Sequence, residues 1–497
     1  MPYNGLTPEM SDEPKKRNLL DKFLGIFTEV RAGEGYLTLA MAFLVFLLMG
    51  AYYLIRPMRK ALILEEGTAE QEIYLYAVMA FLLYFLVQGY AKLVSRYERT
   101  RLISVVTSVF IAMFVASWLL GRLQVPYLGY AFYVWTGIFS VMVVAQFWSY
   151  ANDVYSADAG KRLFPLVGFG GMLGALFGSD LYGRLADYIG VYEIMLVSGA
   201  ILGICILITN LISLKVWGRQ QIRVSQSSLQ DFLTERKESR EREKLAFGIF
   251  KEHKYLWYIA LMFMALNMIN TTGEYILGSL VEKYGESKAE VAVTEATEAG
   301  QNLVFRDRDL GDPQSEEAKR EYVQGTIGVF YAGFYRWQNL LGLFLQLFVV
   351  ARLVKWGGVR AGLLWLPIIA LGTYTLAFVL PVLKFVRFGK VVENASDYSI
   401  NKTTMQMLFL PTSRDIKYKA KQVIDSFFQR VGDVASSLLV FVGTTFLGLG
   451  VRGFAFANLV VIVGWFFAVR GIVSEHREIE AGNRPELTGE ADEELAA

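Results

Sequence analysis

The chain has 497 residues, of which 54% are hydrophobic and only 19% are charged, and its formal net charge is +2. Its mean hydropathy is +0.36. Soluble domains usually carry about 25% charged residues, whereas apolar runs of about 18–25 residues recur along the whole of this sequence. The pattern predicts an all-α integral membrane protein. It excludes a soluble domain, and it also excludes a membrane β-barrel, whose strands would give short alternating segments.

Residue types that support catalysis or metal binding are scarce. Cys205 is the only cysteine and lies in an apolar run, so no intramolecular disulfide can form. His253 and His476 are far apart in the sequence, and no Walker A motif occurs. We therefore expect a protein that is not an enzyme and that has no metal or other cofactor.

The apolar runs predict twelve transmembrane helices in two groups of six. The N-terminal half (36–213) contains spans at 36–64, 73–94, 102–121, 127–151, 163–187 and 191–213. The C-terminal half (255–471) contains spans at 255–280, 324–351, 359–383, 386–410, 420–449 and 453–471. Two six-helix halves joined by a long middle loop are typical of the major facilitator architecture.

Four polar segments flank or interrupt the spans. Residues 1–35 form a tail with a short amphipathic helix at 19–30, and 214–254 form a basic linker. An acidic insert at 281–322 is expected to be a small external subdomain or lid, and 472–497 an acidic, disordered tail. Basic residues gather in the loops on the same side as the linker, so the positive-inside rule predicts that both termini are cytoplasmic.

Three cations interrupt the first span. Arg56, Arg59 and Lys60 are followed by another apolar turn, 61–64. A helix over 36–64 at about 1.5 Å per residue is longer than the roughly 30 Å hydrocarbon core, so these cations lie inside the membrane. A cation there costs roughly 2.5–3.5 kcal/mol and usually faces a wet cavity or a partner. We predict an anion pocket; the alternative is that the side chains snorkel to the surface.

Polar residues also occur at membrane depth in the second half. Span ten places charged and amide side chains at helical spacing, as expected for a cavity wall or for a network of mutually satisfied pairs. Span seven carries further polar residues, and span eight places an arginine between two aromatics. The predicted substrate site consists of Arg56, Arg59, Lys60, Asn270, Arg336, Asn394, Asn401 and Lys402.

Other polar and small residues suggest different roles. Buried carboxylates can relay protons, and the candidates for charge coupling are Glu274, Glu393, Asp397 and Asp425. Gly170, Gly174 and Gly178 recur every fourth residue, which favours close helix packing over nucleotide binding. The remaining candidates for structural or gating roles are Asp153, Lys161, Arg162, Arg430 and Asp433.

Three stretches carry a family resemblance. They read YYLIRPMRKALIL, FWSYANDVYSADAGKRLFPLVGFGGMLGALFG and FLPTSRDIKYKAKQVIDSF. Together they resemble the ATP/ADP translocase family of plastids and intracellular bacteria. The resemblance implies exchange of nucleoside tri- and diphosphates without hydrolysis, with a functional first-span cation at Arg59. Thr136 stands where the family carries a glutamate, and a functional lysine falls near Met405, with Lys402 the nearest cation.

The resemblance implies a distant bacterial member in the inner membrane. We expect a monomer in the lipid bilayer that binds a small anionic substrate and no nucleic acid. Strict exchange is expected because the empty pocket would leave several cations of span one unpaired. Two alternatives stay open: a proton-coupled carrier of another solute, and a non-transporting scaffold or sensor that binds a partner through the insert or the linker.

Overall fold

The computed structural model describes residues 18–25, 28–94, 99–155, 157–217, 253–409, 412, 423–424, 428–481 and 483. The first half contains α1 (Leu19–Leu24), α2 (Gly35–Glu66), α3 (Ala69–Val94), α4 (Arg99–Arg122), α5 (Leu128–Val154), α6 (Ala157–Leu185) and α7 (Val191–Trp217). The second half contains α9 (Lys254–Ala299), β1 (Leu303–Phe305), β2 (Arg308–Gly311), α10 (Glu316–Phe344), η1 (Leu345–Val349), α11 (Val350–Val379), α12 (Leu383–Ser396), η2 (Asp397–Asn401), α13 (Lys402–Leu408), α15 (Gln429–Thr445) and α16 (Val451–Glu480).

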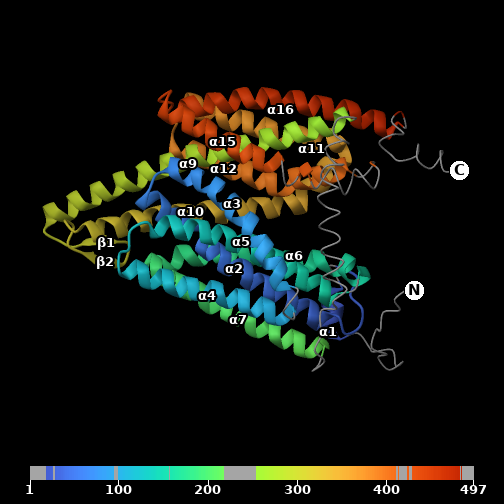
Figure 1. The fold of residues 1–497 in the computed structure, drawn as a ribbon, viewed down its shortest axis with the longest axis horizontal. Coiled ribbons are helices and arrows are strands. Elements are labelled where there is room, and N and C mark those ends of the chain that lie inside the picture. The colour runs from blue at the N-terminus through green and yellow to red at the C-terminus, as the bar shows by residue number, and fades with distance from the viewer. Residues whose placement is uncertain are drawn as a thin grey trace.

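The helices form two bundles that meet along α3 and α10. In Figure 1, α2, α4, α5, α6 and α7 form the lower bundle, and α9, α11, α12, α15 and α16 form the upper one. Within the described residues, seven helical stretches are long and apolar enough to cross a membrane. The longest, Glu316–Val379, reverses at Gly358, whose φ of 59° suits glycine. The all-α membrane fold is confirmed.

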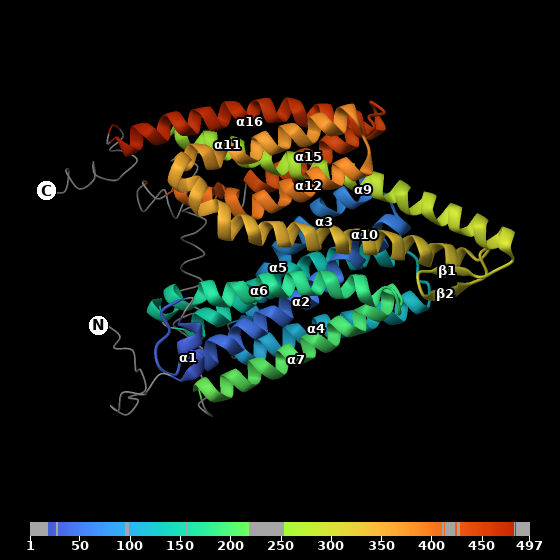
Figure 2. The ribbon, with the colours of Figure 1, turned by 180° about the vertical axis from the view of Figure 1, so that it is seen from behind.

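The insert extends the two helices beside it. In place of a separate subdomain, α9 runs unbroken to Ala299, the antiparallel hairpin β1–β2 follows, and α10 begins at Glu316, where Ser315 caps its first turn. We call residues 281–322 the arm. Figures 1 and 2 show it projecting from one end of the molecule, here named the arm end. The C-terminal ends of helices α2 and α6 also lie there: Arg320 of the arm pairs with Glu65 of α2, and Arg306 of the arm pairs with Asp187, just after α6.

Two further segments differ from prediction. The amphipathic helix α1 ends at Leu24, so only the first half of 19–30 is assigned to it. The last helix, α16, continues through residues 472–480, which we expected to begin the disordered tail. Most of the predicted linker (218–252) and the tail beyond 483 lie outside the described residues.

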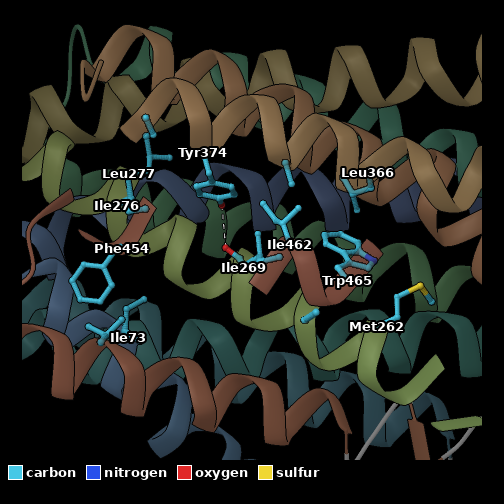
Figure 3. Close-up of a cluster of buried hydrophobic side chains, with 14 of the residues drawn as sticks. Ile73, Met262, Ile269, Ile276, Leu277, Leu366, Tyr374, Phe454, Ile462 and Trp465 are labelled. Carbon is cyan, nitrogen blue, oxygen red and sulfur yellow. Dashed lines mark hydrogen bonds between the residues drawn. The ribbon is translucent and has the colours of Figure 1, made fainter. Parts of the chain in front are cut away.

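Each half has an apolar core. Figure 3 shows part of the core of the second half, where Tyr374 donates a hydrogen bond to the carbonyl of Ile269 at 3.0 Å beside the fully buried Trp465. The same cluster includes Ile63 and Leu64 from the end of α2 and Ile73 from α3. The arm end of the first half therefore packs into the core of the second, and the halves are in close contact there.

The glycine face of α6 brings its backbone against α2. A Cβ added at Gly170, Gly174 or Gly178 would collide with the carbonyl oxygens of Ala42, Phe46 and Gly50 respectively. Only residues without a side chain permit this approach, as in other small-xxx-small faces. One side of α2 is thereby fixed on α6, and its cations lie on a different side.

This packing predicts that replacing glycine by alanine has different effects on stability at two positions. Alanine is favoured over glycine in a helix by about 1 kcal/mol. Gly174→Ala should nevertheless lower the thermal unfolding temperature in detergent, because the new methyl group displaces the backbone of α2. Gly203→Ala in α7 meets nothing within 4 Å and should leave that temperature unchanged or raise it. Equal behaviour of the two variants would contradict the packing.

Candidate functional site

Lys60 is the most fully neutralised cation of α2. Its side chain is 3% exposed and pairs with two carboxylates, Glu72 of α3 in direct contact and Glu274 of α9 at 3.0 Å. The hydroxyl of Tyr133 donates to Glu72 at 2.7 Å. Lys60 and Glu72 belong to the first half and Glu274 to the second, so the ion pair between Lys60 and Glu274 joins the halves.

Arg59 faces aromatic rings in place of carboxylates. It is buried, and its guanidinium carbon lies 4.0 Å from the ring centroid of Tyr133. Its Nε has no hydrogen-bond partner among the described residues. Such stacking holds the guanidinium in place by a cation–π interaction and leaves N–H groups available.

Arg56, one turn earlier, is held in the same way. Its guanidinium carbon lies 4.2 Å from the ring centroid of Tyr335 and 5.3 Å from that of Tyr53, whose hydroxyl accepts a hydrogen bond at 3.1 Å. In the described part of the chain, neither Arg56 nor Arg59 pairs with a carboxylate. Two guanidinium groups on one helix, one half-buried and one buried, therefore keep their charge available for an anion.

A second polar group lies on α12 and η2. Lys390 pairs with Glu393 at 2.9 Å and donates to Asn270 at 3.2 Å. Asn394 donates to Gln338 at 3.3 Å and lies 3.5 Å from Glu274, which links this group to Lys60. The predicted network of satisfied pairs is therefore present, although the second oxygen of Glu393 has no partner among the described residues.

The helix of span ten changes pitch at the predicted site. Residues Asp397–Asn401 form a π-helical turn, in which Asn401 donates to Asp397 at 2.7 Å. Single π-helical turns inside α-helices are frequent at functional sites. Lys402 follows directly, is exposed, and lies 5.4 Å from the ring centroid of Tyr398.

Arg336 lies apart from these groups. Its side chain is 48% exposed and pairs with Asp180 of α6 at 3.0 Å. It therefore contributes a contact between the halves, and its charge is already partly balanced. The structure brings Arg59, Lys60, Asn270 and Asn394 toward one region through the contacts above, with Arg56 one turn away on α2. Asn401 bonds to its own span and Arg336 to α6, so neither is joined to that group by these contacts.

The predicted gating residues lie away from the arm end. Arg162 pairs with Glu34 at 2.9 Å and donates to the carbonyl of Glu29 at 2.6 Å. Burial raises the pKa of Glu34, but hydrogen bonds from Arg162 and the backbone of Arg31 outweigh it and hold the pKa below its ordinary value. Asp153 is exposed and Asp433 half-buried. The side chains of Lys161, Asp425 and Arg430 lie outside the described residues.

Sequence reasoning missed the partners of the first-span cations. Glu72 stands one residue before the predicted start of span two, where we counted it as part of a loop. Tyr133 and Tyr335 lie in apolar runs, where a tyrosine is usually packing, and no spacing rule connects them to α2. Acids from other helices thus offset the charge of Lys60, whereas Arg56 and Arg59 have no carboxylate partner in the described chain.

Comparison with known proteins bears out the family resemblance. A family model described as TLC ATP/ADP transporter matches residues 124–285, from just before α5 into α9. An ADP,ATP carrier protein 4 from Rickettsia bellii (strain RML369-C) is 22% identical over 536 residues, which cover 94% of this chain and 96% of the relative. Both matches are to membrane transporters, as the resemblance predicted, and the long apolar helices agree with a multi-pass membrane protein.

Solved structures share the fold at low identity. A POT family transporter in complex with a thioalcohol-conjugated peptide has a TM-score of 0.57 and 13% identity, covering 91% of this chain and 98% of that chain. A mutant of the nucleoside transporter NupG has a TM-score of 0.56 and 10% identity, covering 88% and 99%. These likenesses establish a major-facilitator-like fold for this chain and nothing about its cargo.

The two expected departures from the family pattern are both buried. Thr136 is buried on α5, and its hydroxyl donates a hydrogen bond to the carbonyl of Phe132 at 2.8 Å. Met405 is buried on α13. Neither supplies a charge, and the nearest charged residue to Met405 along the described part of the tenth span is Lys402.

The contact between Tyr133 and Glu72 gives a matched test of the cluster. Tyr133→Phe keeps the ring under Arg59 but removes a hydrogen bond to a buried carboxylate, and such bonds contribute about 1.5–3 kcal/mol. We expect a lower thermal unfolding temperature. Tyr182→Phe removes an equally buried hydroxyl that has no hydrogen-bond partner in the described chain, and should change that temperature little. A neutral Tyr133→Phe would show that Glu72 does not depend on this bond.

Proposed function

We propose that the protein exchanges nucleoside tri- and diphosphates, or a closely related phosphorylated anion, across a membrane by alternating access. The observation that carries the proposal is a pair of arginines, the half-buried Arg56 and the buried Arg59, that stack on tyrosines and lack carboxylate partners within the described residues. Arginine suits phosphate because its planar fork donates two charge-assisted hydrogen bonds at once. The relative from Rickettsia bellii, an ADP,ATP carrier protein, supports nucleotides as the cargo.

In this proposal Arg56 and Arg59 bind phosphate groups, while Asn270, Asn394 and Asn401 hydrogen-bond the rest of the substrate. Lys402 is exposed, so it is suited to attract an anion into the site. Arg336 is assigned a weaker role because Asp180 already balances it.

The proposed carrier has twelve spans in two halves, 36–213 and 255–471, joined by the linker 214–254. Both termini and the linker would lie in the cytoplasm of a bacterial inner membrane, and the arm end would face outward. The direction of the loop charges supports this orientation. The contacts at the arm end then correspond to a carrier closed toward the outside. A monomer suffices for this scheme, since both halves belong to one chain.

Exchange is favoured over net flux because Arg56 and Arg59 have no carboxylate partner in the described chain. Moving unpaired guanidinium groups through the closed intermediate costs free energy, which a bound phosphate offsets. Proton coupling is the second candidate, because Glu393 is buried with one oxygen unpartnered in the described chain. In that case a protonophore would abolish uptake.

Transport by purified protein in liposomes tests the proposal. Labelled ADP should enter vesicles preloaded with ATP and enter empty vesicles much more slowly. Arg59→Ala should lower uptake at limiting substrate by about 30-fold, since truncating one partner of a buried charge pair costs about 2 kcal/mol or more. Arg59→Lys should restore only part of it, because an ammonium group lacks the fork.

The control is Arg122→Ala, which removes an arginine of the same half that pairs with Glu193 and whose side chain is 62% exposed. Its uptake should match that of the parent protein. Equal uptake by Arg59→Ala and the parent would refute the phosphate site on α2.

A further inference from the structure

The ion pair of Lys60 connects the two halves through two largely buried side chains. Lys60 belongs to α2 of the first half, and Glu274, 3.0 Å away, belongs to α9 of the second. Glu72, the other partner of Lys60, lies on α3 of the first half and is fixed there by Tyr133. The three charged groups together carry a net charge of −1.

The two carboxylates depend on Lys60 to different degrees. Any movement that parts the halves at the arm end leaves Lys60 with Glu72, because both belong to the first half. Glu274 then loses its ion-pair partner and keeps Asn394, an uncharged partner at 3.5 Å in its own half, together with the more distant charge of Lys390. A carboxylate that loses a buried partner pays a large cost unless something else compensates.

The other ion pairs between the halves each include a more exposed cation. Arg320 pairs with Glu65 at 3.0 Å, but its side chain is 58% exposed. Arg336 and Arg306 pair with Asp180 and Asp187, again with half-exposed side chains. Exposed pairs contribute about 0–1 kcal/mol, so they hold the halves together weakly. Lys60 and Glu274 are 3% and 13% exposed and are screened much less.

We propose that the Lys60–Glu274 ion pair is a latch that keeps the arm end closed while the site is empty. This inference rests on the proposed function and gives Lys60 and Glu274 positioning roles in it, in place of the substrate-binding and proton-coupling roles predicted from sequence. A phosphorylated anion on Arg59, the residue next to Lys60, competes with Glu274 for the ammonium group. Substrate binding therefore weakens the latch, and the arm end opens with substrate present.

The latch predicts that Glu274→Gln opens the arm end without substrate. Leu64 reports this opening, because it is 2% exposed and a Cβ at Gly278 of the other half would lie 3.8 Å from it. The background is Cys205→Ser with Leu64→Cys, labelled in detergent by a hydrophilic maleimide. Glu274→Gln should raise the labelling rate by about fivefold or more, the factor that corresponds to about 1 kcal/mol.

Two matched variants complete the experiment. Asp21→Asn removes another buried carboxylate, which accepts hydrogen bonds from the backbone of Gly33 and Gly35 within its own half, and should leave labelling at the background rate. Glu274→Asp keeps the charge and should remain slow, which separates loss of the ion pair from loss of folding. Unchanged labelling in Glu274→Gln, or an equal rise in Asp21→Asn, would overturn the latch.

Labelling also separates this inference from the proposed cargo. Faster labelling in Glu274→Gln, with no effect of added ADP on the parent, would support the latch and count against nucleotide as the substrate. ADP uptake by the parent together with unchanged labelling in Glu274→Gln would support nucleotide exchange and refute the latch.

Discussion

A charged side chain among apolar helices must have a partner, and α2 carries three such side chains within two turns. The fold answers this requirement in two ways. Lys60 receives carboxylates from α3 and α9, whereas Arg56 and Arg59 receive tyrosine faces from α2, α5 and α10. Carboxylates neutralise a cation, but a ring holds a guanidinium without cancelling its charge. The distinction divides one short sequence into a structural cation and two cations suited to bind an anion.

The opposite side of α2 explains why this arrangement is rigid. The glycines of α6 let the two backbones touch, so α2 cannot rotate to present its cations elsewhere. Motion must then occur between the halves, where α2 and α3 pack into the core of the second half at the arm end. The arm adds contacts to α6 and α7 on the same side. Binding residues and the contacts between halves thus share one helix, which is what alternating access requires of a carrier.

The helical membrane fold could be predicted from the sequence because the patterns that indicate it lie within single helices. Hydropathy over one helix length predicted α2 and the other long helices, and the spacing of Gly170, Gly174 and Gly178 predicted close packing. The site was predicted only in part. The cations of α2 were recognised by their depth, but Glu72, Tyr133 and Tyr335 come from other helices, and no helical periodicity connects residues of different helices. The arm was predicted as an external insert, but its helical form was missed: its helices are polar, so hydropathy ended them at the membrane surface.

The central claim is that two arginines without carboxylate partners recognise phosphate groups. Equilibrium binding of adenosine, AMP, ADP and ATP to the purified protein tests it most directly, without reconstitution or a gradient. The account predicts that affinity rises from adenosine to AMP and again to ADP, because each added phosphate gains charge-assisted hydrogen bonds from Arg56 and Arg59. Adenosine binding as tightly as ADP would contradict it, since the base and ribose alone would then account for recognition.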